Sequence, residues 1–252
     1  PAPEPAAPEF NFIPTVSLAE GGEAITKGNA WEIFRANADG SRGEGIATEY
    51  EAYKGNLEPG NYVVEARVSE ARIEQPVVIE PGKVTEQHFV LNAGTLKISP
   101  KATAGSEPDA GAAVHFIYPG GDWVTYGPTT VVVPAGEQTV KVKLGEAEVS
   151  ETFALKAGEV IEKDIVAGVG VVKVNAFYAP GMKVEADGIT VNILEAKKDI
   201  NGKRKDVAYT FGPDKQFSLP PGDYVVVFKQ EGAEAEAPFT IKTGDSISVD
   251  VV

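Results

Sequence analysis

The sequence predicts an all-β protein made of three tandem seven-stranded Greek-key β-sandwiches. Three observations predict this fold. A motif that ends in glycine occurs three times, a second glycine turn follows each copy at a fixed distance, and apolar and polar side chains alternate between the two glycines. No segment combines a sustained 3.6-residue period with helix-capping residues, so no helix is expected.

The spacing of the glycine turns defines the repeat. The first glycines are Gly60, Gly136 and Gly222, and 22 residues separate each from a second one, at Gly82, Gly158 and Gly244. The copies are 76 and 86 residues apart, which is the size of a small domain rather than of a solenoid repeat. We therefore expect sandwiches over 10–92, 93–167 and 168–252, preceded by a Pro/Ala/Glu-rich tail or linker over 1–9.

The residues after each first glycine alternate with a period of two, as in a strand with one buried face. In the first copy Val64, Ala66 and Val68 are predicted to face inward, with Glu65 and Arg67 outward. The equivalent outward positions of the later copies are Lys141, Lys143, Val227 and Lys229. One face of each such strand should therefore belong to a core.

The third copy yields seven predicted strands, which is typical of a small sandwich. They cover 170–177, 189–196, 206–211, 215–219, 223–230, 233–241 and 245–251. The Asn201-Gly202 pair between the second and third strands predicts a hairpin with a type I′ turn, which requires two positive φ angles.

Three aromatic residues are predicted to be structural. Trp31 is in register with apolar residues of the other copies and should lie in the core. Tyr62 and Tyr224 stand two residues after the glycine of the turn, where a tyrosine can pack beneath the turn and donate its hydroxyl to the backbone. Gln138 holds this position in the second copy, so the device should be missing or replaced there.

Composition restricts the chemistry. The 252 residues include no cysteine and two histidines, which excludes disulfides, thiol nucleophiles and three-histidine metal sites within the chain. The 23 basic and 37 acidic residues give a net charge of −14, which argues against binding of nucleic acid. No apolar run reaches the roughly 20 residues of a membrane span, so direct membrane insertion is not expected. No catalytic or calcium-loop motif occurs, so we expect no enzyme activity, cofactor or metal; weak surface binding of calcium stays open.

Both histidines are predicted to be surface residues. His88 is in register with Asp164 and Asp250, and His115 is in register with Glu32 and Asn192. A position that holds a carboxylate in another copy is typical of a solvated strand face. We therefore expect no catalytic role for either imidazole.

The turn and strand over 219–226, Leu-Pro-Pro-Gly-Asp-Tyr-Val-Val, resemble carboxypeptidase-regulatory-like and Cna B-type sandwiches of the transthyretin-like, immunoglobulin-like class. The junction over 90–97 is similar to junctions in tandem repeats that accompany von Willebrand factor A domains in exported Gram-negative bacterial proteins. The resemblance implies an extracytoplasmic protein that is periplasmic, secreted or on the cell surface. Many Cna B-type domains carry a Lys–Asn cross-link, but Lys97 and Lys173 are predicted to face solvent, so none is expected here.

Two functions remain open from the sequence. The first is a non-enzymatic spacer or adhesion scaffold, either monomeric or part of a larger polypeptide or assembly. The second is a module that binds a protein or a surface glycan through the aromatic segment 116–126, with Tyr118, Trp123 and Tyr126 as contacts. The competing interpretation of this segment is a structural hairpin whose aromatic side chains cover the core and bind no ligand.

The junctions predict the overall shape. Residues 92–94 and 166–170 are too short to let neighbouring sandwiches fold back on one another. Strands of six to eight residues at about 3.3 Å per residue then predict a stiff rod longer than about 80 Å. Gly168 and Gly170 predict that the second junction bends more easily than the first.

Overall fold

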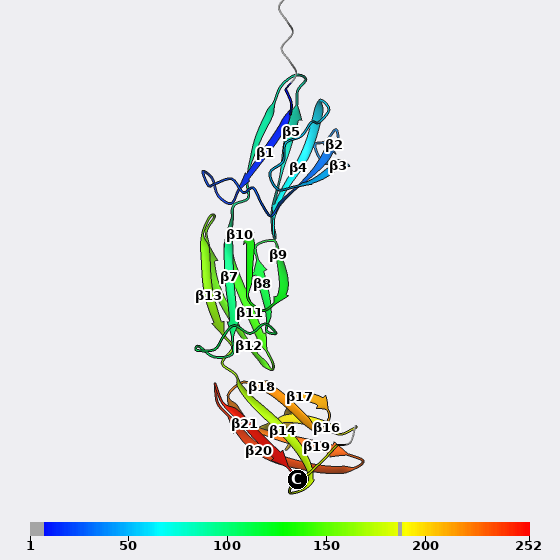
Figure 1. Ribbon diagram of the computed structural model, residues 1–252, viewed down its shortest axis with the longest axis vertical. Coiled ribbons are helices and arrows are strands. Elements are labelled where there is room, and N and C mark those ends of the chain that lie inside the picture. Colours follow the sequence, from blue (N-terminus) through cyan, green and yellow to red (C-terminus); the bar gives the residue numbers. More distant parts are fainter. Residues whose placement is uncertain (1–7, 186–187) are drawn as a thin grey trace, which may run out of the picture.

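The computed structural model describes residues 8–185 and 188–252, and within these residues it contains 21 strands and no helix. The prediction of an all-β chain is confirmed. The strands form three pairs of facing sheets that follow one another along the long axis (Figure 1). We refer to these pairs as the N-terminal, central and C-terminal sandwiches.

The N-terminal sandwich packs a two-stranded sheet against a four-stranded one. The first contains β1 (Phe12–Ser17) parallel to β6 (Thr85–Val90). The second has the order β3-β2-β4-β5, from β2 (Asn29–Ala36), β3 (Arg42–Tyr50), β4 (Gly60–Val68) and β5 (Ala71–Ile79). Alternate side chains of both sheets meet in a core that includes Trp31, which is 1% exposed, as predicted.

The central and C-terminal sandwiches repeat this plan. The central sheets have the orders β10-β7-β13 and β12-β11-β8-β9, from β7 (Ala93–Lys101), β8 (Ala113–Tyr118), β9 (Gly121–Tyr126), β10 (Thr129–Pro134), β11 (Gly136–Leu144), β12 (Ala147–Leu155) and β13 (Val160–Val166). In one C-terminal sheet, β14 (Gly170–Ala179) pairs with β15 (Met182–Lys183), β18 (Asp214–Leu219) and β21 (Ser246–Val251). The other C-terminal sheet has the order β17-β16-β19-β20, from β16 (Thr190–Lys198), β17 (Arg204–Phe211), β19 (Gly222–Gln230) and β20 (Ala233–Ile241). Each sandwich has its own apolar core.

The strand count differs from seven in two sandwiches. The N-terminal sandwich has six, because the segment that should pair with β1 keeps only a bridge between Phe12 and Gly55. The side chain of Asn11 bonds both backbone groups of Leu57, at 2.8 and 2.9 Å, and so takes the place of further ladder bonds. The C-terminal sandwich has eight, because the two-residue β15 folds back on the end of β14.

Two side chains predicted to face solvent are buried. Glu65 is 4% exposed and Val227 is 2% exposed, although both lie on the outer face of their sheet. An arginine from the edge strand covers each of them: Arg42 bonds Glu65 directly, and Arg204 of β17 reaches Glu236 of β20, 3.1 Å away, across β16 and β19. Period-two alternation reports the face of a strand, but it does not report what a long side chain from a neighbouring strand covers.

The hairpin at Asn201-Gly202 forms, but its turn is not type I′. Gly202 has a positive φ of 77°, but Asn201 does not have a positive φ, and a type I′ turn would require one there. The N–H of Gly202 donates to the carbonyl of Asp199 at 3.0 Å, and the Asp199 carboxylate accepts from the N–H groups of Asn201 and Lys203 at 2.8 Å each. The aspartate thus stabilises a type I turn that glycine closes.

The corner device predicted for Tyr62 and Tyr224 is confirmed. Their hydroxyls donate to the carbonyls of Glu58 at 2.7 Å and Pro220 at 3.0 Å, in each case four residues earlier. In the central sandwich Gln138, 1% exposed, replaces the tyrosine, and its amide donates to the Pro134 carbonyl at 2.9 Å. The same backbone carbonyl is therefore satisfied in all three sandwiches by two different chemical groups.

Removing the corner hydroxyls should weaken the fold. We expect Tyr62→Phe and Tyr224→Phe each to lower the free energy of unfolding by about 1 kcal/mol, because each leaves a turn carbonyl without its donor. Urea denaturation measures the change, and Tyr126→Phe, at a tyrosine 68% exposed, is the matched control. Equal stability of all three variants and the parent chain would show that the hydroxyls contribute nothing.

Candidate functional site

The three aromatic residues proposed as contacts lie on the β8–β9 hairpin but do not form one surface. The indole of Trp123 stacks on Phe116 at the edge of the central core, with ring centroids 5.7 Å apart. Tyr118 is half-buried, and its hydroxyl donates to Oε2 of Glu70, 3.0 Å away, in the N-terminal sandwich. Of the three, Tyr126 alone is exposed, at 68%. The hairpin therefore offers one free ring rather than an aromatic platform.

Burial of the Tyr118 hydroxyl, together with its hydrogen bond to Glu70, raises the pKa of this tyrosine to about 12 from the ordinary value of 10.0. Burial is the larger cause, because the tyrosinate would lose its hydration. Glu70 lies in the turn between β4 and β5, so this contact joins two sandwiches. Tyr118 is thus part of a junction.

The two histidines make structural contacts. His88 is exposed, as predicted, and its Nδ1 lies 2.8 Å from Oγ1 of Thr15 while its Nε2 lies 3.0 Å from Oγ of Ser17. The Ser17 hydroxyl donates to the Ala19 carbonyl at 2.7 Å, so Nε2 is the donor to Ser17 and Nδ1 accepts from Thr15. In this tautomer His88 cannot take a proton from Ser17, whose side chain is also fully buried. His115 is half-buried and pairs with Asp122 at 2.9 Å.

The residues in register with His88 make the same kind of link. Asp164 accepts from Nζ of Lys101 at 2.6 Å, and Asp250 accepts from the amide of Asn175 at 2.7 Å. In each sandwich a polar pair thus ties the closing strand to the opening strand beside it. This comparison assigns His88 a structural role.

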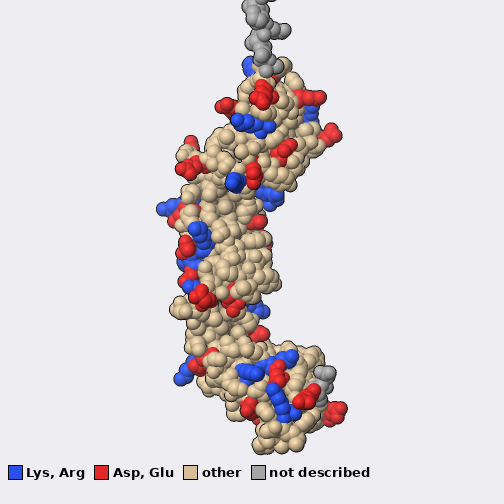
Figure 2. Space-filling model, viewed as in Figure 1, with Lys and Arg blue, Asp and Glu red and all other residues tan. Residues whose placement is uncertain are grey.

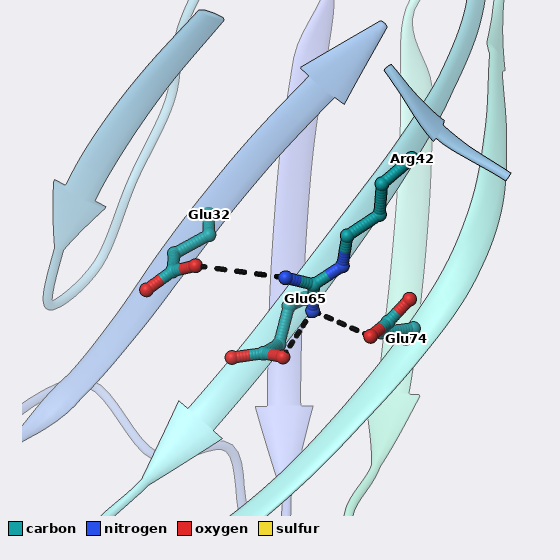
Figure 3. A network of polar contacts seen from close by, with 4 residues as sticks. All are labelled: Glu32, Arg42, Glu65 and Glu74. Atoms are coloured by element: carbon teal, nitrogen blue, oxygen red, sulfur yellow. Dashed lines mark hydrogen bonds and ion pairs between the residues drawn. The ribbon is translucent and has the colours of Figure 1, made fainter. Parts of the chain in front are cut away.

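The outer face of the N-terminal four-stranded sheet carries a charge network (Figure 3). The guanidinium of Arg42 reaches Glu74 at 2.5 Å, Glu65, and Glu32 at 4.0 Å, and it lies 4.6 Å above the ring of Phe34. Hydrogen bonds to Glu74 and then to Glu65 raise the pKa of Arg42 above its ordinary value. One cation therefore contacts three carboxylates from three strands. Glu65 depends on it most, because it is buried and has little contact with water to stabilise its charge.

Replacing Arg42 should destabilise the chain. We expect Arg42→Gln to lower the free energy of unfolding by about 1–3 kcal/mol, because it leaves Glu65 buried without its cation. Arg204→Gln is the matched control, since Arg204 pairs with one carboxylate and covers an apolar residue; its loss should be smaller in urea denaturation. Adding Glu65→Gln to Arg42→Gln should restore part of the stability, and an equal loss in both single variants would contradict this account.

The raised pKa of Tyr118 predicts alkaline behaviour. Its folded-state pKa of about 12 exceeds the ordinary 10.0, so its contribution to stability is complete below pH 10 and is lost as the pH rises towards 12. Ultraviolet absorbance should show that Tyr118→Phe removes one late-ionising tyrosine from the alkaline titration of the parent chain. Loss of an early-ionising group from Tyr118→Phe would contradict the burial argument.

An equivalent backbone hydrogen bond crosses each of the two junctions. The N–H of Glu70 donates to the carbonyl of Val132 at 3.0 Å, and the N–H of Glu146 donates to the carbonyl of Ser218, also at 3.0 Å. The donors are 76 residues apart and the acceptors 86, which are the two repeat offsets of the sequence. A turn of one sandwich thus docks on the equivalent strand of the next sandwich in both places.

The linkers repeat as well. At the first junction Ala93 donates its N–H to Leu18 and accepts from Gly158, at 2.9 and 2.8 Å. At the second, Val169 donates to Ala102 and accepts from Gly244, at 3.1 and 3.0 Å. A left-handed residue precedes each linker residue, namely Asn92 with φ of 50° and Gly168 with φ of 71°. Both junctions therefore repeat these two hydrogen bonds and the left-handed residue before them.

Apolar side chains fill both junctions to different extents. The first contains Leu18, Val68, Ala71, Leu91, Ala93 and Val132, which are continuous with the N-terminal core. The second is a separate small cluster of Ala102, Leu144, Ala147, Ala167 and Val169. At the 76-residue repeat offset, Leu91 of the first junction is replaced by the smaller Ala167, whereas Val68 and Ala93 are replaced by the larger Leu144 and Val169. The second junction thus differs from the first in that its apolar cluster is separate from the cores of the sandwiches.

The described residues contain no cluster of three or more metal-ligating side chains, and none of their elements is a helix able to cross a bilayer. Figure 2 shows acidic and basic side chains interspersed along the visible face. The junctions and the outer sheet faces are therefore the candidate functional features.

No protein-family model matches the sequence, and no curated protein matches it. Among solved structures, the chain is similar to the Bacillus anthracis TIE protein, with 17% identity, a TM-score of 0.27, and coverage of 96% of this chain and 51% of that one. The chain thus spans about half the length of that protein.

Two pilin structures are also similar. The streptococcal ancillary pilin has 10% identity, a TM-score of 0.30 and coverage of 95% of this chain and 97% of its own. BcpA, the major pilin subunit of Bacillus cereus, has 14% identity, a TM-score of 0.22 and coverage of 95% and 97%. At these TM-scores the likenesses carry no conclusion about function.

Proposed function

We propose that this chain is a non-enzymatic spacer or adhesion scaffold in which three sandwich domains, over 10–92, 93–167 and 168–252, are held end to end by stiff joints. The observation that carries the proposal is the repetition of the junction: the same turn, linker and strand make the same backbone hydrogen bonds twice. A flexible linker would leave these backbone groups to water. Joints built this way favour a fixed length.

The location that suits this function is outside the cytoplasm, in the periplasm, on the cell surface or in the medium. This part of the proposal rests on the resemblance to carboxypeptidase-regulatory-like and Cna B-type sandwiches, and the partner would be another protein or a surface glycan. Lys97 and Lys173 are exposed, which supports the absence of an internal cross-link from either lysine. Noncovalent packing would then provide the stiffness.

The alternative, a module that binds through 116–126, has less support. Trp123 and Tyr118 are engaged within the protein, which leaves Tyr126 as the free ring of the three proposed contacts. A single exposed tyrosine gives little contact area.

Distances between spin labels test the joints. The chain has no cysteine, so the equivalent exposed positions Asn61, Glu137 and Asp223 can be labelled in pairs as Asn61→Cys with Glu137→Cys, and Glu137→Cys with Asp223→Cys. We expect a narrow distance distribution for both pairs, and a wider one at the second junction, where the apolar cluster is separate from the neighbouring cores.

The control is a short Gly-Ser insertion after Asn92 or Gly168, which should broaden the distribution only across the altered junction. Distributions in the parent chain as broad as those after insertion would reject the stiff-joint proposal.

A further inference from the structure

An exposed aromatic ring occurs at one equivalent position of all three sandwiches. The rings are Tyr50 on β3, Tyr126 on β9 and Phe211 on β17, with exposures of 66%, 68% and 57%. On the adjacent strand each lies opposite a small residue, Ala30, Ala113 or Thr190, and one strand further stands a cation, Arg67, Lys143 or Lys229. On the outer face of each four-stranded sheet, an aromatic ring and a cation thus flank a small residue on the strand between them.

The cations differ in their partners. Lys229 pairs with Glu234 at 2.9 Å, and Lys143 is directly opposite Glu148. In the N-terminal sandwich, however, Arg67 is directly opposite Arg72, and no carboxylate among the described residues lies within ion-pair distance of either. Like charges opposite each other destabilise a strand pair, so this position is the one that favours an added anion.

A depression of about 380 Å³ lies between Tyr50 and Arg67. Asn29 and Ser69 also line it, and Asn29 is 2% exposed. The Asn29 amide donates to the Glu51 carbonyl at 3.0 Å, while its Oδ1 has no hydrogen-bond partner among the described residues. The volume is within the range of small-ligand sites. The Asn29 side chain lies on the core side of β2, because its amide shares the Glu51 carbonyl with the indole of Trp31.

The groups around the depression suit a sugar acid. The strands that carry Tyr50 and Arg67 are two sheet spacings apart, about 10 Å, which leaves room for one sugar ring above Ala30. The exposed phenol ring offers a flat surface, the guanidinium of Arg67 matches a carboxylate, and the hydroxyl of Ser69 can bond a sugar hydroxyl. Glu51 brings one carboxylate to the rim, against the two guanidinium groups of Arg67 and Arg72.

We propose that the Tyr50–Arg67 depression binds a carboxylate-bearing sugar residue of a glycan. An acidic peptide would use Arg67 but not the flat ring. This binding proposal is independent of the spacer function, because the depression lies within the N-terminal sandwich and the spacer function rests on the junctions.

Titration of the full chain followed by amide NMR tests the site with three probes: trigalacturonic acid, a neutral galactose oligomer of equal length, and a glutamate-rich peptide. We expect trigalacturonic acid to shift the amides of Asn29, Tyr50 and Ser69 and to bind at least tenfold more tightly than the neutral oligomer. Arg67→Gln should weaken binding about tenfold, which corresponds to the loss of one charge-assisted hydrogen bond. Tyr50→Ala should weaken binding several-fold.

The central sandwich supplies matched controls. Lys143→Gln and Tyr126→Ala change the equivalent positions and should leave the Asn29 and Tyr50 shifts unchanged, while thermal unfolding verifies that every variant is folded. Binding of the peptide as tightly as the sugar acid, with no effect of Tyr50→Ala, would replace the saccharide with a simple anion site. Absence of shifts with trigalacturonic acid would overturn the proposal.

Discussion

The arrangement of the chain depends on the parallel pairing of the first and last strands of each sandwich. Because β6 runs beside β1 in the same direction, it delivers the chain to the opposite end from where β1 began. Only two residues, Leu91 and Asn92, separate the end of β6 from the next opening strand, so that strand has no freedom to return along the first sandwich. The left-handed residue Asn92 and the hydrogen bonds of Ala93 then set the direction of the next sandwich.

The sequence predicted the features that local chemistry determines. The spacing of the glycines located the turns, alternation located most of the strands, and the position of Tyr62 after its turn predicted a hydroxyl bond to the backbone that the structure contains. These succeed because a turn needs particular φ angles and a half-buried strand needs one apolar face. Even the replacement of the corner tyrosine by Gln138 follows from the same carbonyl that must be satisfied.

Features that depend on long side chains or on contacts between distant residues were missed. Nothing near Glu65 in the sequence shows that Arg42, 23 residues away, will bury it. The junction bond between Glu70 and Val132 depends on the docking of two sandwiches, and the role of Tyr118 depends on it as well. A signal for the junctions was present in hindsight, since the glutamates at 70 and 146 share the repeat offset, but one residue in register is too weak a pattern to interpret alone.

The parallel pairing also determines how the chain would carry a mechanical load. Tension applied between its two ends pulls β1 and β6 in opposite directions along their shared ladder, and the same holds for β7 with β13 and β14 with β21. Such tension shears six or seven residue pairs at once in each sandwich, whereas force across a hairpin would open its bonds one at a time. Each sandwich is thereby oriented to resist stretching along the axis on which the chain is laid out.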